Sequence, residues 1–133
     1  MARLYLVTRD DLPPGTQACQ AAHAAFDFAV AHPDLVGDWH ATSNTLVVLA
    51  TPDELSLTWL CDDAAAAGLR VVRFHEPDLG GALTAAAFEP AAHRLFSHLP
   101  VALAAAARAP AADARARRDA VRQGDSQRGE VRT

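Results

Sequence analysis

Residues 45–54 read TLVVLATPDE, an apolar run that changes directly into a helix start. Residues 45–50 are almost all hydrophobic and partly β-branched, as expected of a strand that is buried on both faces. Thr51 can cap a helix, Pro52 suits its first position, and Glu54 stands where a capping box places a carboxylate. A buried strand that leads into a helix is the repeating unit of an α/β fold.

The segments on either side continue this alternation. A strand over residues 4–8, a turn over 9–15 and a helix over 16–31 are predicted before it, with residues 33–44 as a loop. The helix that begins at residue 51 is predicted to end near 67, followed by strands 69–75 and 84–88 and a short helix between Pro90 and Pro100. This β-α-β-α-β-β-α order predicts a three-layer α/β/α sandwich whose four-stranded mixed sheet is mostly parallel, with one strand reversed.

Length and charge divide the chain into a body and a tail. Residues 1–100 are expected to form one domain, and they carry five arginines against twelve acidic residues, a net charge of −7. Residues 101–133 carry seven arginines against four acidic residues, a net charge of +3, and almost no large apolar side chain. We therefore expect residues 101–133 to be an Ala/Arg-rich, disordered tail.

Several classes of protein are disfavoured by composition. The two cysteines are too few for a disulfide scaffold, no secretory signal is visible, and no apolar run reaches the ~20 residues of a membrane span. The chain contains no lysine, which excludes Schiff-base and P-loop chemistry. His93 and His98 are spaced too unfavourably for a shared metal, so we expect neither metal nor cofactor. The sequence indicates a soluble, cytoplasmic protein, and it leaves open whether the chain forms a homodimer.

The helix over residues 16–31 carries the most informative pattern. Its polar residues Thr16, Gln20, His23 and Asp27 fall on one stripe about 60° wide. The neighbouring stripe is apolar and is expected to be the buried face; it consists of Cys19, Ala22, Phe26 and Val30. The polar stripe lies beside a helix N-terminus, which favours an anion. A polar stripe is also what an ordinary solvated helix face looks like.

A second polar group follows the third predicted strand. His75, Glu76 and Asp78 stand at its carboxyl end, which is where open α/β sheets bind their ligands. A carboxylate there could act as a general base or orient a water molecule. The alternative is that these residues only build the turn, because Pro, Asp and the Gly80-Gly81 pair are turn formers.

The string Gly15-Thr16-Gln17-Ala18-Cys19-Gln20-Ala21-Ala22-His23-Ala24 resembles the signature Gly-Lys-x-Ala-Ala-Gln-Cys-x-His-Ala of the type 2 peptidyl-tRNA hydrolase family. It stands in the matching place, after a first strand and a polar turn. Gly68-Leu69, a strand, an acidic turn and a last strand that contains Thr84 are similar to the second half of that family. The resemblance covers roughly residues 3–100, everything except the tail.

The resemblance implies a carboxylic ester hydrolase that cleaves the ester joining a peptide to tRNA, or a related RNA ester, without a metal. By position, Gln20 and His23 correspond to the Gln and His of the family. Glu76 corresponds to its active-site Asp, with Asp78 as the alternative, and Thr84 to a threonine of the last strand. Substrate binding would then fall to Gly15 and Thr16 at the helix start.

Two departures from the family pattern are visible. Thr16 replaces the signature lysine, and Glu76-Pro77-Asp78 replaces an Asp-x-Gly turn. Arg9 or Arg73 could partly replace the lysine as a substrate-binding cation, but the acidic body suits a polyanionic substrate poorly. The sequence therefore supports two hypotheses: a peptidyl-tRNA hydrolase-like esterase, or a non-catalytic binding or interaction module on the same fold.

Overall fold

The computed structural model describes residues 2–104, and residues 2–103 belong to one compact unit. Nearly all of the predicted tail lies outside the described residues. In chain order the elements are β1 (Arg3–Arg9), α1 (Pro14–Ala31), α2 (Pro33–Thr42), β2 (Thr45–Thr51), α3 (Glu54–Ala66), β3 (Val71–Glu76), the 3₁₀ helix η1 (Pro77–Leu79), β4 (Ala82–Phe88) and the 3₁₀ helix η2 (Pro90–Phe96).

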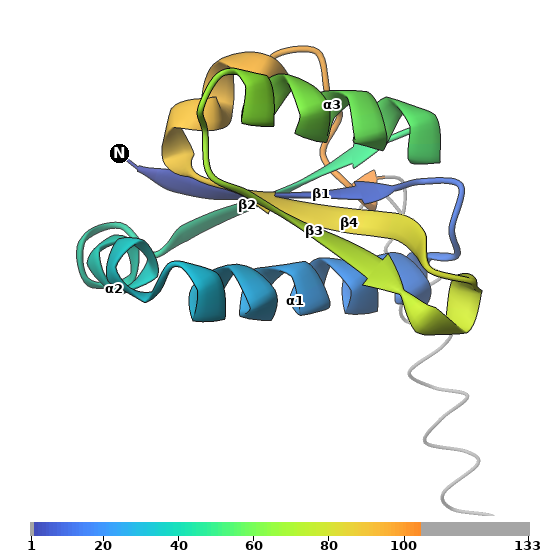
Figure 1. The fold of residues 1–133 in the computed structure, drawn as a ribbon, viewed down its shortest axis with the longest axis horizontal. Coiled ribbons are helices and arrows are strands. Elements are labelled where there is room, and N and C mark those ends of the chain that lie inside the picture. Colours follow the sequence, from blue (N-terminus) through green and yellow to red (C-terminus); the bar gives the residue numbers. More distant parts are fainter. Residues whose placement is uncertain (1, 105–133) are drawn as a thin grey trace, which may run out of the picture. The chain divides into compact units, whose positions relative to one another are not determined.

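The sheet has four strands in the order β2-β1-β4-β3. Strands β1 and β2 pair in parallel, whereas β4 lies between β1 and β3 and is antiparallel to both. Figure 1 shows α1 and α2 on one face of the sheet and α3 with η2 on the other. The predicted three-layer α/β/α sandwich with one reversed strand is confirmed. Because the reversed strand is internal, only the β1–β2 pairing is parallel.

Residues 33–44 are not the predicted loop. They form α2, which begins with Pro33 at its first position and Asp34 in its first turn, both favourable helix-start residues. The helix is tied to the sheet by Trp39, whose Nε1 donates a hydrogen bond of 2.9 Å to the carbonyl oxygen of Thr45. The short stretch between His32-Pro33 and the next strand was therefore wrongly predicted to be a loop, although it forms a second helix.

The start of α3 lies two residues later than predicted. Asp53 is the N-cap, and its carboxylate accepts a hydrogen bond of 2.8 Å from the backbone N–H of Ser56. The Thr51 hydroxyl instead donates to the carbonyl oxygen of Thr8 at 3.3 Å. Thr51 therefore links β2 to the neighbouring strand β1, and Asp53 caps α3.

The buried face of α1 differs from the predicted one. Its buried residues are Gln17, Gln20, Ala21, Ala24 and Phe28. The predicted apolar face is largely exposed: Cys19 and Ala22 are exposed, and the side chains of Phe26 and Val30 are 73% and 82% exposed. Gln20 turns inward to bond Glu76 and Thr84, and Gln17 bonds the carbonyl oxygen of Leu12 in the preceding loop, although its Oε1 has no partner among the described residues. With these two side chains buried, the apolar stripe is rotated toward solvent.

Each face of the sheet has its own core. On the α1 side, Leu4 and Leu6 of β1 pack with Phe28, Ala85 and Ala87. On the α3 side, the core contains Val7, Leu49, Leu57, Leu60, Cys61, Ala86 and Phe88. Cys61 is fully buried, and burial raises the pKa of its thiol to about 11. Cys61 therefore acts as a small core residue.

The outer edge of β2 is covered by the segment that follows η2. Val101 forms an antiparallel bridge with Leu49. The backbone N–H of Ala50 donates to the carbonyl oxygen of Pro100 at 3.0 Å, and that of Ala102 donates to the carbonyl oxygen of Val48 at 2.9 Å. The first residues of the predicted tail thus pair with the sheet.

Two phenylalanines on α1 provide a matched test of these faces. Phe28 is fully buried and Phe26 is 73% exposed, so Phe28→Ala should lower the free energy of unfolding by about 3–5 kcal/mol. Phe26→Ala should change it by no more than about 0.5 kcal/mol. Chemical denaturation of both variants measures the difference. Equal losses would mean that Phe26 belongs to the core and that α1 presents a different face to the sheet.

Candidate functional site

A β-bulge places Thr84 in the site. Phe74 of β3 pairs with Ala85 of β4, but the next residue, His75, pairs with Leu83, so Thr84 is an extra residue on β4. As a result Leu83 joins the core on the α3 side while Ala85 joins the core on the α1 side. The bulge directs the buried Thr84 side chain toward α1, where it meets Gln20.

Gln20, Glu76 and Thr84 form a continuous chain of hydrogen bonds. The Gln20 Nε2 donates to Glu76 Oε2 at 3.0 Å, and the Thr84 hydroxyl donates to Gln20 Oε1 at 2.6 Å. A carboxylate can only accept, so the amide nitrogen of Gln20 must face Glu76. Its oxygen must then face Thr84, which makes the hydroxyl the donor. Three elements, α1, β3 and β4, are joined through this one amide.

The same contacts keep Glu76 ionised. The hydrogen bond from Gln20 is the main cause that lowers the pKa of Glu76; the backbone N–H of Asp78 and the charge of His23 lower it further. The Asp78 N–H reaches Glu76 Oε1 at 3.2 Å, so each carboxylate oxygen has one donor. Such a group stabilises the fold above the pKa that it has in the unfolded chain, and this contribution is lost as pH falls through its folded value. Each oxygen keeps lone pairs for a water molecule or a substrate hydroxyl.

His23 lies one helical turn beyond Gln20 and is exposed. Its ring stacks on the ring of Phe74 with centroids 4.6 Å apart and an interplanar angle of 14°. Phe74 belongs to β3, the strand that ends in Glu76. The stacking holds the imidazole over the same strand that carries the carboxylate, with its edge open to solvent.

The remaining predicted site residues are distributed around this cluster. Asp78 is exposed in η1, and its backbone N–H, rather than its carboxylate, contacts Glu76. Gly15 is exposed and Thr16 half-buried in the first turn of α1, where N–H groups lack acceptors within the helix. Adding a Cβ at Gly15 would meet no neighbouring atom, so the glycine is not required by packing there.

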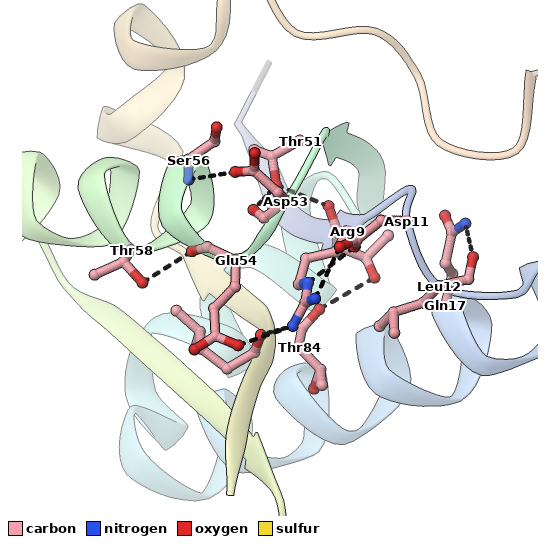
Figure 2. Close-up of polar contacts among 12 residues, drawn as sticks. Arg9, Asp11, Leu12, Gln17, Thr51, Asp53, Glu54, Ser56, Thr58 and Thr84 are labelled. Atoms are coloured by element: carbon pink, nitrogen blue, oxygen red, sulfur yellow. Dashed lines mark hydrogen bonds and ion pairs between the residues drawn. The ribbon is translucent and has the colours of Figure 1, made fainter. Parts of the chain in front are cut away.

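Arg9 is held at the end of β1 by four hydrogen bonds of its guanidinium (Figure 2). Its guanidinium donates two hydrogen bonds of 2.9 Å to the Asp11 carboxylate and further bonds of 3.0 Å to Glu54 Oε2 and the carbonyl oxygen of Leu83. The side chain is only 13% exposed, and the hydrogen bond with Asp11 is the main cause that raises its pKa. Arg9 therefore fastens the loop after β1, the start of α3 and the residue before the bulge to one another.

Arg73 lies on the other face of the sheet. Its guanidinium donates to Asp62 Oδ1 of α3 at 2.8 Å, whereas Gln20 and Glu76 meet on the α1 side. The structure thus brings together Gln20, Glu76 and Thr84, places His23 beside them, and does not bring Arg73 to them.

Two polar residues of this region were not singled out by the sequence. The buried Thr8 hydroxyl donates to the carbonyl oxygen of Thr84 at 3.3 Å and so fixes the bulge from β1. Gln17 is 4% exposed, and its Nε2 donates to the carbonyl oxygen of Leu12 at 2.7 Å, which holds the loop against α1. A polar residue at the carboxyl end of an apolar strand was the available signal for Thr8; nothing in the sequence marked Gln17 as buried.

Residues 2–104 lack two further features. No group of three or more His, Cys, Asp or Glu side chains in this part of the chain could hold a metal ion. Nor does the described region contain a helix that is long and apolar enough to cross a membrane.

The fold and the cluster place the chain among small α/β proteins whose polar groups gather where the strands end. Within that class, the family model described as Peptidyl-tRNA hydrolase PTH2 matches residues 2–105. The match includes every helix and strand described above, and the chain belongs to this family of hydrolases. No curated protein matched the chain in a sequence search.

The order of the influences on Glu76 can be measured. Gln20→Leu removes the largest one, so the pKa of Glu76 should rise, and His23→Gln, which removes the smallest, should raise it less. Carbon-13 NMR titration of the Glu76 carboxyl in the unchanged protein and the two variants measures both shifts. A larger shift in His23→Gln than in Gln20→Leu would contradict this arrangement of hydrogen bonds.

Proposed function

We propose that the protein hydrolyses the ester that joins a peptide to tRNA, or a closely related RNA ester, at the Gln20–Glu76–Thr84 cluster. The observation that carries this proposal is the ionised Glu76 carboxylate, oriented by the amide of Gln20 and retaining free lone pairs. Membership of a peptidyl-tRNA hydrolase family supports this substrate. A role in translation would place the protein in the cytoplasm.

The reaction needs an attacking water molecule and a route for its proton. The water oxygen forms a bond to the ester carbonyl carbon, the bond to the ribose oxygen breaks, and one proton of the water ends on that ribose oxygen. Glu76 is positioned to accept a hydrogen bond from this water and so to orient it. Gln20 and Thr84 act as positioning residues, because they hold the carboxylate in place.

Proton transfer is assigned to His23. A lowered pKa makes Glu76 a weak base, and a general base works best when its pKa lies near the operating pH. Imidazole is the side chain that enzymes use most often for this task, and His23 is exposed beside Glu76. Asp78 is the alternative carboxylate, and its exposed side chain leaves it free to approach a large substrate.

The start of α1 is the place for the developing negative charge. The first-turn N–H groups at Gly15 and Thr16 point outward from the helix end and favour an anion. Thr16 stands where the signature has lysine, and loss of one such donor commonly lowers a rate by about 10²–10³-fold. Arg9 is held by Asp11, Glu54 and Leu83, and Arg73 is on the opposite face, so neither replaces the lysine without rearrangement. We therefore expect slow hydrolysis.

The missing lysine favours a second candidate function, a binding module that keeps the fold without turnover. Such a protein would bind the RNA ester and leave it intact. Substitutions at Glu76 and at Thr16 separate these functions.

Glu76→Gln should abolish release of tRNA from a peptidyl-tRNA, because a neutral amide at this position loses the charge that orients water. Asp78→Asn is the matched control and should stay within a few-fold of the unchanged protein. A gel assay of peptidyl-tRNA cleavage with purified proteins measures both. Activity that survives in both variants would refute a carboxylate in the reaction, and loss in Asp78→Asn alone would move the role to Asp78.

Restoring the signature lysine should accelerate the reaction. Thr16→Lys adds a cation at the helix start and should raise kcat by roughly 10-fold or more, given the usual effect of one such donor. Thr42→Lys adds the same charge at an exposed threonine in the last turn of α2 and should not. Single-turnover cleavage kinetics distinguish the two. RNA ester that is bound but left intact by both the unchanged protein and Thr16→Lys would establish the binding module.

A further inference from the structure

A cavity lies on the other side of the sheet from the Gln20–Glu76–Thr84 cluster. It has a volume of about 570 Å³ and opens beside the carboxyl end of β2. Its walls come from α3, the loop after β1, and the segment that runs from η2 to Pro100. Ligands of α/β sheets gather outside the carboxyl ends of the strands, and the size is that of a small-molecule site.

The largest side chain in this cavity is Trp59 of α3. Its indole is 60% exposed, which is unusual for the residue that gains most from burial in a domain of this size. Asp63 follows it by four residues on the same helix, so the carboxylate and the indole share one face of α3. An exposed indole beside a carboxylate offers a stacking surface and a hydrogen-bond acceptor together.

The opposite wall supplies positive charge. Arg94 and His98 line the cavity, and both are exposed. Within residues 2–104, Arg9, Arg70 and Arg73 are each in an ion pair, whereas Arg94 has none. The Arg94 guanidinium is therefore available to a ligand without first breaking an internal contact.

We propose that this cavity binds one unpaired nucleotide of the RNA substrate. The base stacks on Trp59, an exocyclic amino group donates to Asp63, and Arg94 with His98 meets the phosphate. Stacking on an aromatic side chain is the common way in which proteins hold single-stranded bases, and carboxylates accept from the amino group of cytosine. The inference rests on the proposed function for its choice of RNA, because it gives that substrate a second point of contact.

The cavity and the cluster are joined by the loop after β1. Asp10 lines the cavity, and its backbone N–H donates to the carbonyl oxygen of Thr51 at 2.9 Å. The preceding residue, Arg9, donates to the carbonyl oxygen of Leu83 beside the bulge. The loop after β1 therefore contacts both the cavity and the strand that carries Thr84.

Mononucleotides test the cavity without any hydrolysis. CMP and AMP should shift the indole N–H resonance of Trp59 in an NMR titration of the full chain and should bind more tightly than UMP, which lacks the amino donor. Trp59→Leu should weaken CMP binding roughly tenfold or more, the usual effect of removing one stacking partner. Arg94→Gln should weaken CMP but not cytidine, and Asp63→Asn should remove the preference for CMP over UMP.

Matched controls use the same residue types elsewhere. Phe26→Leu removes an exposed aromatic side chain on α1, and Arg3→Gln removes an exposed arginine on β1; both should bind CMP unchanged. Ribose 5-phosphate that binds as tightly as CMP would reduce the site to a phosphate contact and overturn the proposal. N-acetylphenylalanine amide that binds as tightly as CMP would make it a peptide pocket and also overturn it.

The hydrolase proposal and the nucleotide-site proposal can be refuted independently of each other. Glu76→Gln protein should still bind CMP, since Glu76 lies outside the cavity. CMP binding that depends on Trp59, together with intact peptidyl-tRNA, would refute the hydrolase and leave the nucleotide site standing. Hydrolysis without any Trp59-dependent binding of CMP would do the reverse.

Discussion

The amide of Gln20 lies between the Glu76 carboxylate, which can only accept a hydrogen bond, and the Thr84 hydroxyl, which donates one. This gives the side chain a single orientation, and the rest of the site depends on it. Gln20 is 5% exposed, so its contacts with Glu76 and Thr84 also satisfy polar atoms that would otherwise be buried without partners. The rotation of α1, the bulge in β4 and the charge on Glu76 are linked through one glutamine.

Burying the polar face of α1 leaves large apolar side chains exposed on the outside of the helix. With Gln17 and Gln20 directed inward, Phe26 and Val30 face outward. Phe26 lines a groove of about 590 Å³ whose other walls are apolar residues of α1, α2, β1, β2 and residues 102–103. An amphipathic helix ordinarily buries its apolar stripe. In α1, the Gln20 amide is satisfied at both ends, whereas Gln17 is bonded only through Nε2 and its buried Oε1 has no partner among the described residues. The helix therefore buries two polar side chains while two large apolar ones stay exposed, which is the kind of local conflict that functional sites tend to contain.

The sequence predicted the strands, the sheet and the polar stripe because their signals are local. Continuous apolar runs, Pro at helix starts and a Gly-Gly turn each depend on a few neighbouring residues. The orientation of α1 could not be predicted in this way. Periodicity separates an apolar from a polar stripe, but it does not show that the Thr84 hydroxyl lies beneath the helix as a partner for Gln20. The bulge at Thr84 was likewise invisible, since Ala85, Ala86 and Ala87 fit either face of a strand. The helix over Pro33–Thr42 was missed because a short, mixed segment after a proline is also typical of a loop.

The segment over residues 100–102 has a consequence for how the chain emerges during synthesis. Strand β2 contains the sequence TLVVLA, whose hydrophobicity, β-propensity and lack of charge are typical of segments that aggregate through exposed edges. Its outer edge at Val48–Ala50 is capped by residues that come about fifty positions later in the chain. Until those residues have left the ribosome, the outer edge of β2 is unpaired and prone to aggregate with other strands. The length of chain needed for a product that does not aggregate is therefore set by this late segment rather than by the last helix of the core.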